Sequence, residues 1–233
     1  MNNREEVAHG TMAFHFEKPA GFEFKPGQFV DVTLLNPPPM DAGGAIRTFS
    51  IASAPYENEL VVATRMRDTS FKREFAKLPL GTQVTLEGPS GSFTLHKNAA
   101  KPAVFLAGGI GITPFRSMLR QAAKDPLPRA LTLFYSNRRP EDAAFLDELR
   151  ILSQTGPNFI FVPAMSGMEK SSRQWAGERG VIDRAMLEKY CPALDAPIFY
   201  VAGPPAMVAA MQHMLAEAGV DEDNIRSEEF CGY

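Results

Sequence analysis

Five short apolar runs alternate with four helix-like segments in the second half of the chain, and this alternation restricts the fold more than any other feature. The runs are AVFLAG, ALTLFYS, FIFVPAM, IFYVAG and IRSEEF, all after residue 101. Parallel strands need long crossover connections, which are usually helices. The alternation therefore predicts a five-stranded, doubly wound parallel sheet with strand order 3-2-1-4-5.

Start and stop signals support the helices of this half. Thr113 is expected to cap a helix whose first position is Pro114. Pro205 is expected to open the last helix, and Gly219 stands where a left-handed residue ends it. A stripe of methionines and aliphatic residues from Met207 to Leu215 is predicted to pack into the core. The predicted helices cover residues 115–124, 141–152, 183–190 and 206–218.

The first hundred residues follow a different pattern, in which short strands are separated by turn-forming Pro and Gly residues. Strand candidates of this spacing are typical of an antiparallel barrel. The candidates are residues 11–16, 29–35, 48–52, 60–67, 83–87 and 92–96. We therefore expect an antiparallel β-barrel domain at 1–100 and an α/β domain at 101–233.

Composition excludes several classes of protein. A net charge of -3 and a pI near 5.9 disfavour a nucleic-acid-binding surface. No apolar run reaches the length of a membrane span, and the opening MNNREEVAHG lacks the apolar core of a secretory signal. The two cysteines and scattered histidines predict no metal site and no iron–sulfur cluster in this chain. A cytoplasmic location is expected.

Two glycine-rich turns follow the first and fourth strands of the predicted sheet. They read GGIGITP at 108–114 and GPP at 203–205. In an open parallel sheet the ligand lies where strand order reverses, which for this order is between these two strands. Glycine allows the backbone to approach a ligand, and the following helix start offers N–H groups to an anion. The two turns together predict a dinucleotide site; tight turns without a ligand are the alternative.

The second strand of the sheet ends in Ser136-Asn137-Arg138-Arg139. The chain has no G-x-G-x-x-G fingerprint and no acidic residue at the spacing that would hold a ribose 2′-hydroxyl. A hydroxyl and two guanidinium groups suit a 2′-phosphate instead. NADP(H) is therefore favoured over NAD(H), although solvated loop arginines are an equal alternative.

Taken in order, these and further motifs resemble the ferredoxin-NADP reductase superfamily along nearly the whole chain. The barrel motif R-x-Y-[ST] of that family reads Arg47-Thr48-Phe49-Ser50 here. A second element appears as LPLG at 78–81 and GPSGSF at 88–93. The nucleotide half carries GGIGITP and YVAGPPAM at 200–207. The resemblance implies a flavoprotein that holds FAD in the barrel and NAD(P)H in the α/β domain.

The resemblance also implies roles for individual residues. Arg47 is expected to clamp the FAD pyrophosphate, and Phe49 to stack on the flavin in place of the family tyrosine. Ser50 is expected to donate to the flavin N5 region. Ser70-Phe71-Lys72 matches the second pyrophosphate-binding stretch by position, and Thr64 the strand that lines the flavin. An ordinary exposed lysine and a packed threonine are the alternatives for Lys72 and Thr64.

At the end of the chain, Tyr233 is expected to stack on the flavin face that nicotinamide must reach, and to swing aside as a gate. A frayed end with an idle tyrosine is the alternative. Glu229 is read as a surface glutamate rather than a proton relay. Plant-type reductases carry Cys before the last Gly-Pro, whereas this chain has Ala202, so thiol assistance is absent at that position.

The predicted function is hydride transfer from NAD(P)H to bound FAD, followed by single-electron transfer to a protein acceptor such as ferredoxin, flavodoxin or an oxygenase component. A reductase of free flavin or ferric iron, and a non-catalytic flavin- and nucleotide-binding subunit, are alternatives. Ser50 and Tyr233 are the predicted catalytic residues. The predicted cofactor contacts are Arg47, Thr48, Phe49, Ser50, Thr64, Ser70, Phe71, Lys72, Gly108, Gly109, Gly111, Ile112, Thr113, Pro114, Ser136, Arg138, Arg139, Gly203, Pro204, Met207 and Tyr233.

Overall fold

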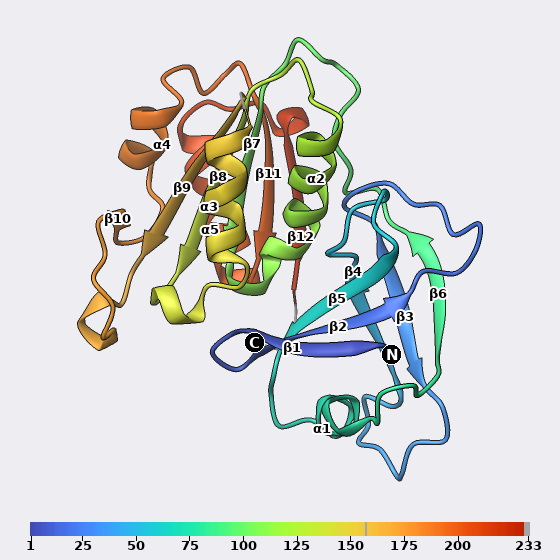
Figure 1. Cartoon of the computed structure of the whole chain (residues 1–233). Coiled ribbons are helices and arrows are strands. Elements are labelled where there is room, and N and C mark those ends of the chain that lie inside the picture. The colour runs from blue at the N-terminus through green and yellow to red at the C-terminus, as the bar shows by residue number, and fades with distance from the viewer. Residues whose placement is uncertain (157, 231–233) are drawn as a thin grey trace.

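The computed structural model describes residues 1–156 and 158–230, and it contains a barrel-like β region followed by an α/β region (Figure 1). The β region has two antiparallel three-stranded sheets, ordered β1-β2-β5 and β4-β3-β6. An isolated bridge between Ile51 and Val62 connects them. The elements are β1 (Asn3–Ala8), β2 (Thr11–Glu17), β3 (Phe29–Leu34), β4 (Ile46–Ser50), β5 (Glu59–Arg65), α1 (Ser70–Lys77) and β6 (Val84–Ser90).

Alternating side chains close the barrel around an aromatic core. In β3, Val30, Val32 and Leu34 are buried and their neighbours are partly exposed, as expected for a strand with one face inward. Helix α1 plugs the barrel with Phe71 and Phe75, which lie four residues apart on one face. The rings of Phe71 and Phe75 lie 5.3 Å apart, centroid to centroid.

Two elements of the barrel differ from the sequence prediction, and one predicted strand does not form. Strand β1 pairs with β2 and was not predicted, because its charged sequence NREEVA shows no regular alternation. Helix α1 stands where only a binding stretch was expected. Residues 92–96 form no strand; instead Phe93 packs onto the α/β core beside Phe115 and Tyr200.

The α/β region confirms the predicted doubly wound parallel sheet and its strand order. The order is β10-β9-β8-β7-β11-β12, with every adjacent pair parallel. The five predicted strands are β7 (Ala103–Gly108), β8 (Leu131–Asn137), β9 (Phe159–Met165), β11 (Ile198–Gly203) and β12 (Ile225–Glu229). The sixth, β10 (Glu178–Arg179), has two residues and is too short for a sequence pattern to reveal.

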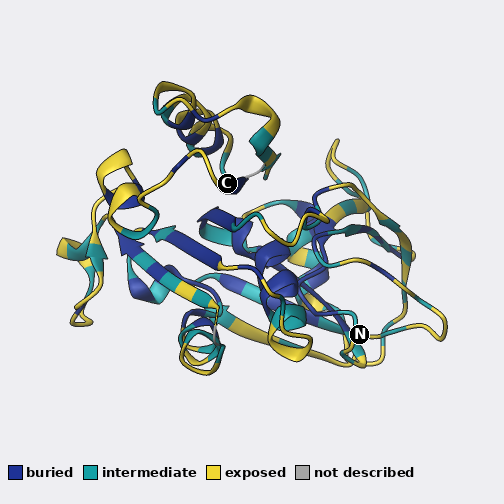
Figure 2. Ribbon diagram, turned by 90° about the horizontal axis from the view of Figure 1, so that it is seen from above, coloured by how far each residue is buried: buried dark blue, intermediate teal, exposed yellow. Residues whose placement is uncertain are grey.

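Helices cover both faces of this sheet and leave its central strands buried (Figure 2). The helices are α2 (Ile112–Lys124), α3 (Leu146–Thr155), α4 (Arg184–Tyr190) and α5 (Pro205–Glu217). Alternate residues of β7 point to opposite faces: Phe105 packs with α2 and α3, and Leu106 with α4 and α5. Burial on both faces explains why this strand reads as a continuous apolar run.

The structure corrects the predicted start of helix α2. Helix α2 begins at Ile112 with Gly111 at its N-cap, so Thr113 lies inside the first turn and donates its hydroxyl to the Ile110 carbonyl at 3.0 Å. The three-residue 3₁₀ turn at Gly109–Gly111 leads directly into the helix and removes the need for a side-chain cap. Helix α5 opens at Pro205 as predicted, and Gly219 after it has φ +81°. No helix in the described ranges is both long and apolar enough to cross a bilayer.

Candidate functional site

A large open cavity of about 850 Å³ lies at the carboxyl ends of the central strands. Its walls come from the turns after β7, β8 and β11, which the reversal of strand order brings together. Gly108, Gly109, Ser136, Arg138, Pro204 and Met207, all predicted contacts, line it. Sequence reasoning missed Arg65 and Arg67, which reach the same cavity from the end of barrel strand β5.

The two glycine turns pack against each other so closely that side chains would not fit. A Cβ on Gly111 would overlap the backbone carbonyl of Ala202, and one on Gly108 would overlap the sulfur of Met207. Gly203 lies against the backbone of Gly108, where a Cβ would come within 3.2 Å. The result is bare backbone at the cavity wall, which suits a phosphate or a nicotinamide ring.

Some predicted contacts lie behind the cavity wall rather than on it. The start of α2 is buried and does not line the cavity. It holds four of the predicted contacts: Gly111, Ile112, Thr113 and Pro114. Arg139 is engaged by Asp142 through two bonds of 2.9 and 2.7 Å. This bidentate pair at positions i and i+3 makes Arg139 a poor candidate for a phosphate contact, whereas Arg138 is exposed at the cavity.

The methionine stripe of α5 serves both the core and the cavity. Val208, Met211 and Leu215 are buried against the sheet, as predicted. The large cavity is also lined by this helix, through Met207, Met211 and Met214, which give it an apolar wall. The prediction of core packing did not include this second role.

A second, smaller pocket of about 160 Å³ lies on the barrel. It is lined by Arg47, Thr48, Phe49, Ser50, Ala63, Thr64, Arg65, Thr69, Lys72, Ile110 and Phe230. The family motif at 47–50 and Thr64 therefore come together as predicted. Arg65 lines both pockets, and the turn at Gly109–Gly111 touches the larger one through Gly109 and the smaller one through Ile110. The two pockets adjoin.

Positive charge accumulates in the barrel pocket. Lys72 donates to the Arg65 carbonyl at 2.7 Å. Burial, reinforced by the nearby charges of Arg67 and Arg47, lowers the pKa of Lys72 to about 8. Burial and the neighbouring arginines make the protonated form of Lys72 less favourable. A bound anion would favour the protonated form again. The donor set of this pocket thus fits a pyrophosphate.

Arg47 is held at the rim by the loop that precedes it. Its guanidinium donates to the carbonyls of Gly43, Gly44 (3.1 Å) and Ile46 (2.7 Å). Asp41 lies 3.6 Å from the same guanidinium. These contacts hold the charge beside the pocket with donors still available to a ligand, since a guanidinium carries five N–H groups.

Ser70 and Phe71 do not line this pocket. The Ser70 hydroxyl accepts from the Asp41 N–H at 3.0 Å, and the Ser70 N–H donates back to the Asp41 carboxylate at 3.0 Å. These bonds lower the pKa of Asp41 and tie the loop to α1. Phe71 is fully buried in the barrel core beside Phe49. The expected binding stretch is a helix start, with Thr69 as its cap.

The final strand adds two residues that the sequence reading did not single out. Phe230 lines the barrel pocket, and its N–H donates to the Gly203 carbonyl at 2.9 Å. Glu228 pairs with Ala202 in the sheet, and its Oε2 is buried without a hydrogen-bond partner in the described part of the chain. Burial raises the pKa of Glu228 to about 7. Glu229 is exposed, as expected, and Tyr233 lies outside the described residues.

Comparison with known proteins agrees with this geometry. Residues 105–213 match the family model of the oxidoreductase NAD-binding domain. The glycine betaine monooxygenase reductase subunit of Chromohalobacter salexigens is 30% identical over 224 residues, which are 94% of this chain and 60% of that protein. The propane 2-monooxygenase reductase component of Rhodococcus jostii is 29% identical, over 91% of this chain and 57% of that protein. The chain spans less than two thirds of each relative.

Solved structures give the same fold. Phthalate dioxygenase reductase superposes with a TM-score of 0.73 at 26% identity, covering 97% of this chain and 65% of that one. A ferredoxin NADP+ reductase from Neisseria gonorrhoeae with bound FAD and NADP superposes with a TM-score of 0.78 at 23% identity, covering 97% and 95%. These reductases share with this chain an antiparallel barrel followed by an α/β region, the two regions that carry the adjoining pockets. The chain therefore shares the fold of these two reductases, and its α/β region matches the oxidoreductase NAD-binding domain.

Proposed function

We propose that the protein is an NAD(P)H-dependent reductase that holds FAD in the barrel, residues 1–100, and NAD(P)H in the α/β domain, residues 101–233. One observation carries the proposal. The Gly109–Gly111 turn lines both pockets, so a ligand in each would meet at this turn. A bound flavin supplies the chemistry, because it accepts two electrons as hydride and releases them singly.

In this proposal, residues of the chain bind the flavin and the nucleotide, orient them and shield them. Arg47 and Lys72 hold the FAD pyrophosphate, and Ser50, which is buried at the pocket, presents its hydroxyl to the ring-nitrogen side of the flavin. The bare turns at Gly108–Gly109 and Gly203–Pro204 seat the nicotinamide half of the nucleotide. Phe230 covers the barrel pocket, and the Glu228 carboxyl holds or loses a proton near neutral pH beside Ala202.

We further propose a protein acceptor of the oxygenase-component, ferredoxin or flavodoxin class. Two curated relatives are reductase parts of monooxygenases, which supports this class. Because those relatives are longer than this chain, the acceptor is assigned by chemistry: a protein that takes one electron at a time. The sequence has only two cysteines, too few for a disulfide framework, and this supports a cytoplasmic location as part of the same proposal.

A preference for NADPH rests on Arg138 and Ser136, which line the large cavity, and no longer on Arg139. A 2′-phosphate beside Arg138 would gain a charge-assisted, bidentate bond. Arg138→Ala should therefore weaken NADPH binding about 10- to 100-fold and leave NADH binding within about twofold. The matched control is Arg150→Ala, which removes an arginine of α3 that lines neither pocket and contacts Asp147 and the ring of Trp175.

The test is a visible spectrum of the purified protein followed by parallel anaerobic titrations with NADPH and NADH. A bound-flavin spectrum that bleaches with either nucleotide supports the proposal. A colourless protein that reduces added free flavin would make flavin the substrate. FAD that neither nucleotide reduces would contradict reductase activity and favour a binding subunit.

A further inference from the structure

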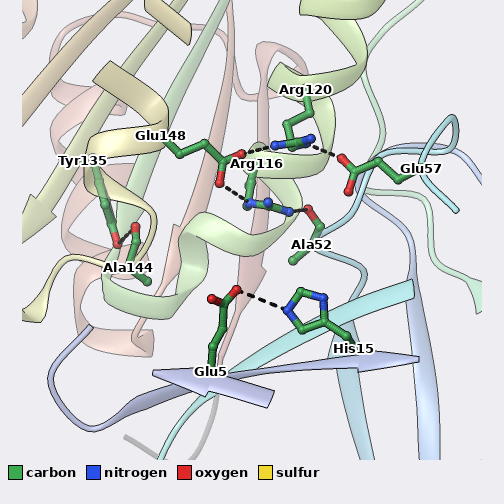
Figure 3. A network of polar contacts seen from close by, with 9 residues as sticks. All are labelled: Glu5, His15, Ala52, Glu57, Arg116, Arg120, Tyr135, Ala144 and Glu148. Atoms are coloured by element: carbon green, nitrogen blue, oxygen red, sulfur yellow. Dashed lines mark hydrogen bonds and ion pairs between the residues drawn. The ribbon is translucent and has the colours of Figure 1, made fainter. Parts of the chain in front are cut away.

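Two consecutive side chains of helix α2 donate hydrogen bonds to two consecutive backbone carbonyls of the barrel. Arg116 donates from a terminal guanidinium nitrogen to the Ala52 carbonyl at 2.7 Å (Figure 3). Ser117 donates its hydroxyl to the Ser53 carbonyl at 2.6 Å. Both donors are buried, with Arg116 at 8% and Ser117 at 0% exposure. Buried bonds to carbonyls of this kind hold a backbone segment in one place.

The segment held by these two bonds, Ala52–Ser53, continues the strand that carries the catalytic candidate Ser50. Ala52 and Ser53 follow β4 within three residues of Ser50. The segment is also locked to β5: the Ala52 N–H donates to the Val61 carbonyl at 2.8 Å, and the Val61 N–H donates to the Ser53 hydroxyl at 3.0 Å. Moving Ala52 would therefore move both strands that wall the barrel pocket.

The other end of α2 carries the turn shared by the two pockets. The helix begins at Ile112, immediately after Gly109–Gly111, and Arg116 lies about one turn further along. A single helical turn is stiff, so the place of the glycine turn follows from the place of Arg116. A short chain of contacts, from Ser50 through Ala52 and Arg116 to Gly111, thus links the two pockets.

Besides the Ala52 carbonyl, two neighbours hold the Arg116 guanidinium. Its Nε donates to a Glu148 carboxylate oxygen at 3.0 Å. The ring of Phe145 lies 4.5 Å from the guanidinium carbon, within cation–π range. Phe145 is one of two non-glycine residues with positive φ in the described ranges, at +59°, a conformation that a bulky residue adopts only where the surroundings hold it. Its ring also packs against the cluster of Ala13, Ala52, Val61 and Ala63.

We propose that Arg116 is a positioning residue for hydride transfer: by holding the Ala52 carbonyl it sets the approach of the nicotinamide site to the flavin site. Ser117 reinforces it through the next carbonyl. The inference rests on the proposed function and deepens it. Arg116 touches neither ligand pocket, so its effect on the reaction passes through the backbone that it holds.

Arg120 provides a matched comparison within the same network (Figure 3). It lies four residues further along α2, also pairs with Glu148, at 2.6 Å, and also reaches the barrel, at the side chain of Glu57. Both partners of Arg120 are side chains, and its partner in the barrel, Glu57, lies outside the segment Ala52–Ser53. Loss of Arg120 should weaken the contact between the two regions without releasing the Ala52 carbonyl.

The experiment measures anaerobic reduction of the FAD-loaded protein by NADPH in a stopped-flow instrument, for the wild type and the Arg116→Met, Arg116→Lys, Ser117→Ala and Arg120→Met variants. For Arg116→Met we expect a limiting reduction rate about 10- to 100-fold lower, with the nucleotide Kd within about threefold. Arg116→Lys keeps one donor and should fall between Arg116→Met and the wild type. Arg120→Met should stay within about twofold of the wild-type rate.

Backbone hydrogen exchange of the flavin-free protein gives a readout that does not depend on activity. Arg116→Met should speed exchange at residues 50–54 and 61, and Arg120→Met should leave these amides protected. A slower reduction rate without faster exchange in this segment would overturn the inference. So would wild-type reduction rates in both Arg116 variants. If Arg116→Met fails to fold, Arg116→Lys and Ser117→Ala carry the same comparison.

Failure of the proposed function has a different signature. A wild-type protein that holds FAD and is reduced by neither NADPH nor NADH overturns the reductase proposal, and the inference with it. A wild-type protein that is reduced normally, together with an Arg116→Met variant that is reduced equally fast, overturns the inference alone.

Discussion

The two pockets are built by different means. In the α/β region, backbone at Gly108 and Gly109 forms part of the wall beside the side chains of Arg138 and Met207, with tight glycine packing behind it. In the barrel the wall is cationic side chains, with Lys72 partly buried among arginines. A backbone site depends on the fold being intact, whereas a side-chain site can lose its charge while the fold survives. Substitutions in the two pockets should therefore fail in different ways.

The largest effect is expected from Gly111→Ala. The added Cβ would overlap the Ala202 carbonyl and the Gly203 nitrogen, which are backbone atoms that cannot turn aside. We expect a loss of about 1–3 kcal/mol in the free energy of unfolding, with loss of nucleotide binding, measured by denaturant titration and calorimetry. The matched barrel variant is Gly43→Ala, whose Cβ would meet side-chain atoms of Arg47 and Asp41 rather than backbone. Equal destabilisation by both would break the comparison.

An intermediate effect is expected from Lys72→Met. Removing this cation should weaken FAD binding about 10- to 100-fold at pH 7 while the barrel stays folded. Lys77→Met, which removes an exposed lysine from the same helix, is the control. Flavin fluorescence quenching gives both dissociation constants.

The same lysine predicts a pH dependence of FAD affinity. In the free protein the pKa of Lys72 is about 8, below its ordinary value of 10.5, so above pH 8 the free pocket is losing the charge that a pyrophosphate needs. The affinity of the wild type for FAD should fall as pH rises from 8 to 10, and that of Lys72→Met should stay flat over the range. If the FAD affinities of the wild type and of Lys72→Met fall equally as pH rises, a group other than Lys72 titrates.

The smallest effect concerns Glu228, which pairs with Ala202 in the last strand. Its folded-state pKa of about 7 lies above the ordinary 4.5, so the stability it contributes is complete below pH 4.5 and is lost as pH rises to about 7. Glu228→Gln should gain about 2–4 °C in Tm over the wild type at pH 8, and less at pH 5. A pH-independent gain would contradict the assignment; Glu229→Gln, an exposed change beside it, should shift Tm little.

The same contrast explains what could be predicted from the sequence. The α/β half is specified by local patterns: apolar runs, a Pro that opens α5 and glycines directly before α2. The barrel half depends on pairings between distant segments, so the charged strand β1 was missed. Helix α1 was also missed, although Thr69 as a cap and Phe71 and Phe75 at helical spacing were visible signals.

Errors in the predicted site have the same origin. The Arg139–Asp142 pair lies within one turn and was open to inspection, but the choice between a phosphate contact and a structural pair needs coordinates. Phe230 and Glu228 acquire their places from pairing between β12 and β11, and Arg116 from a barrel carbonyl 64 residues before it. No local pattern encodes such partners.

The path of β12 also constrains how the protein matures. Phe230 lines a pocket whose other walls come from residues 47–110, and the strand that precedes it, β12, pairs with β11. A chain emerges from the ribosome N-terminus first, so the barrel can fold well before this last wall has been synthesised. A flavin captured early would sit in an open cradle and exchange with solution. Firm retention of the flavin should therefore be one of the final events of biogenesis, after the sheet has gained its last strand.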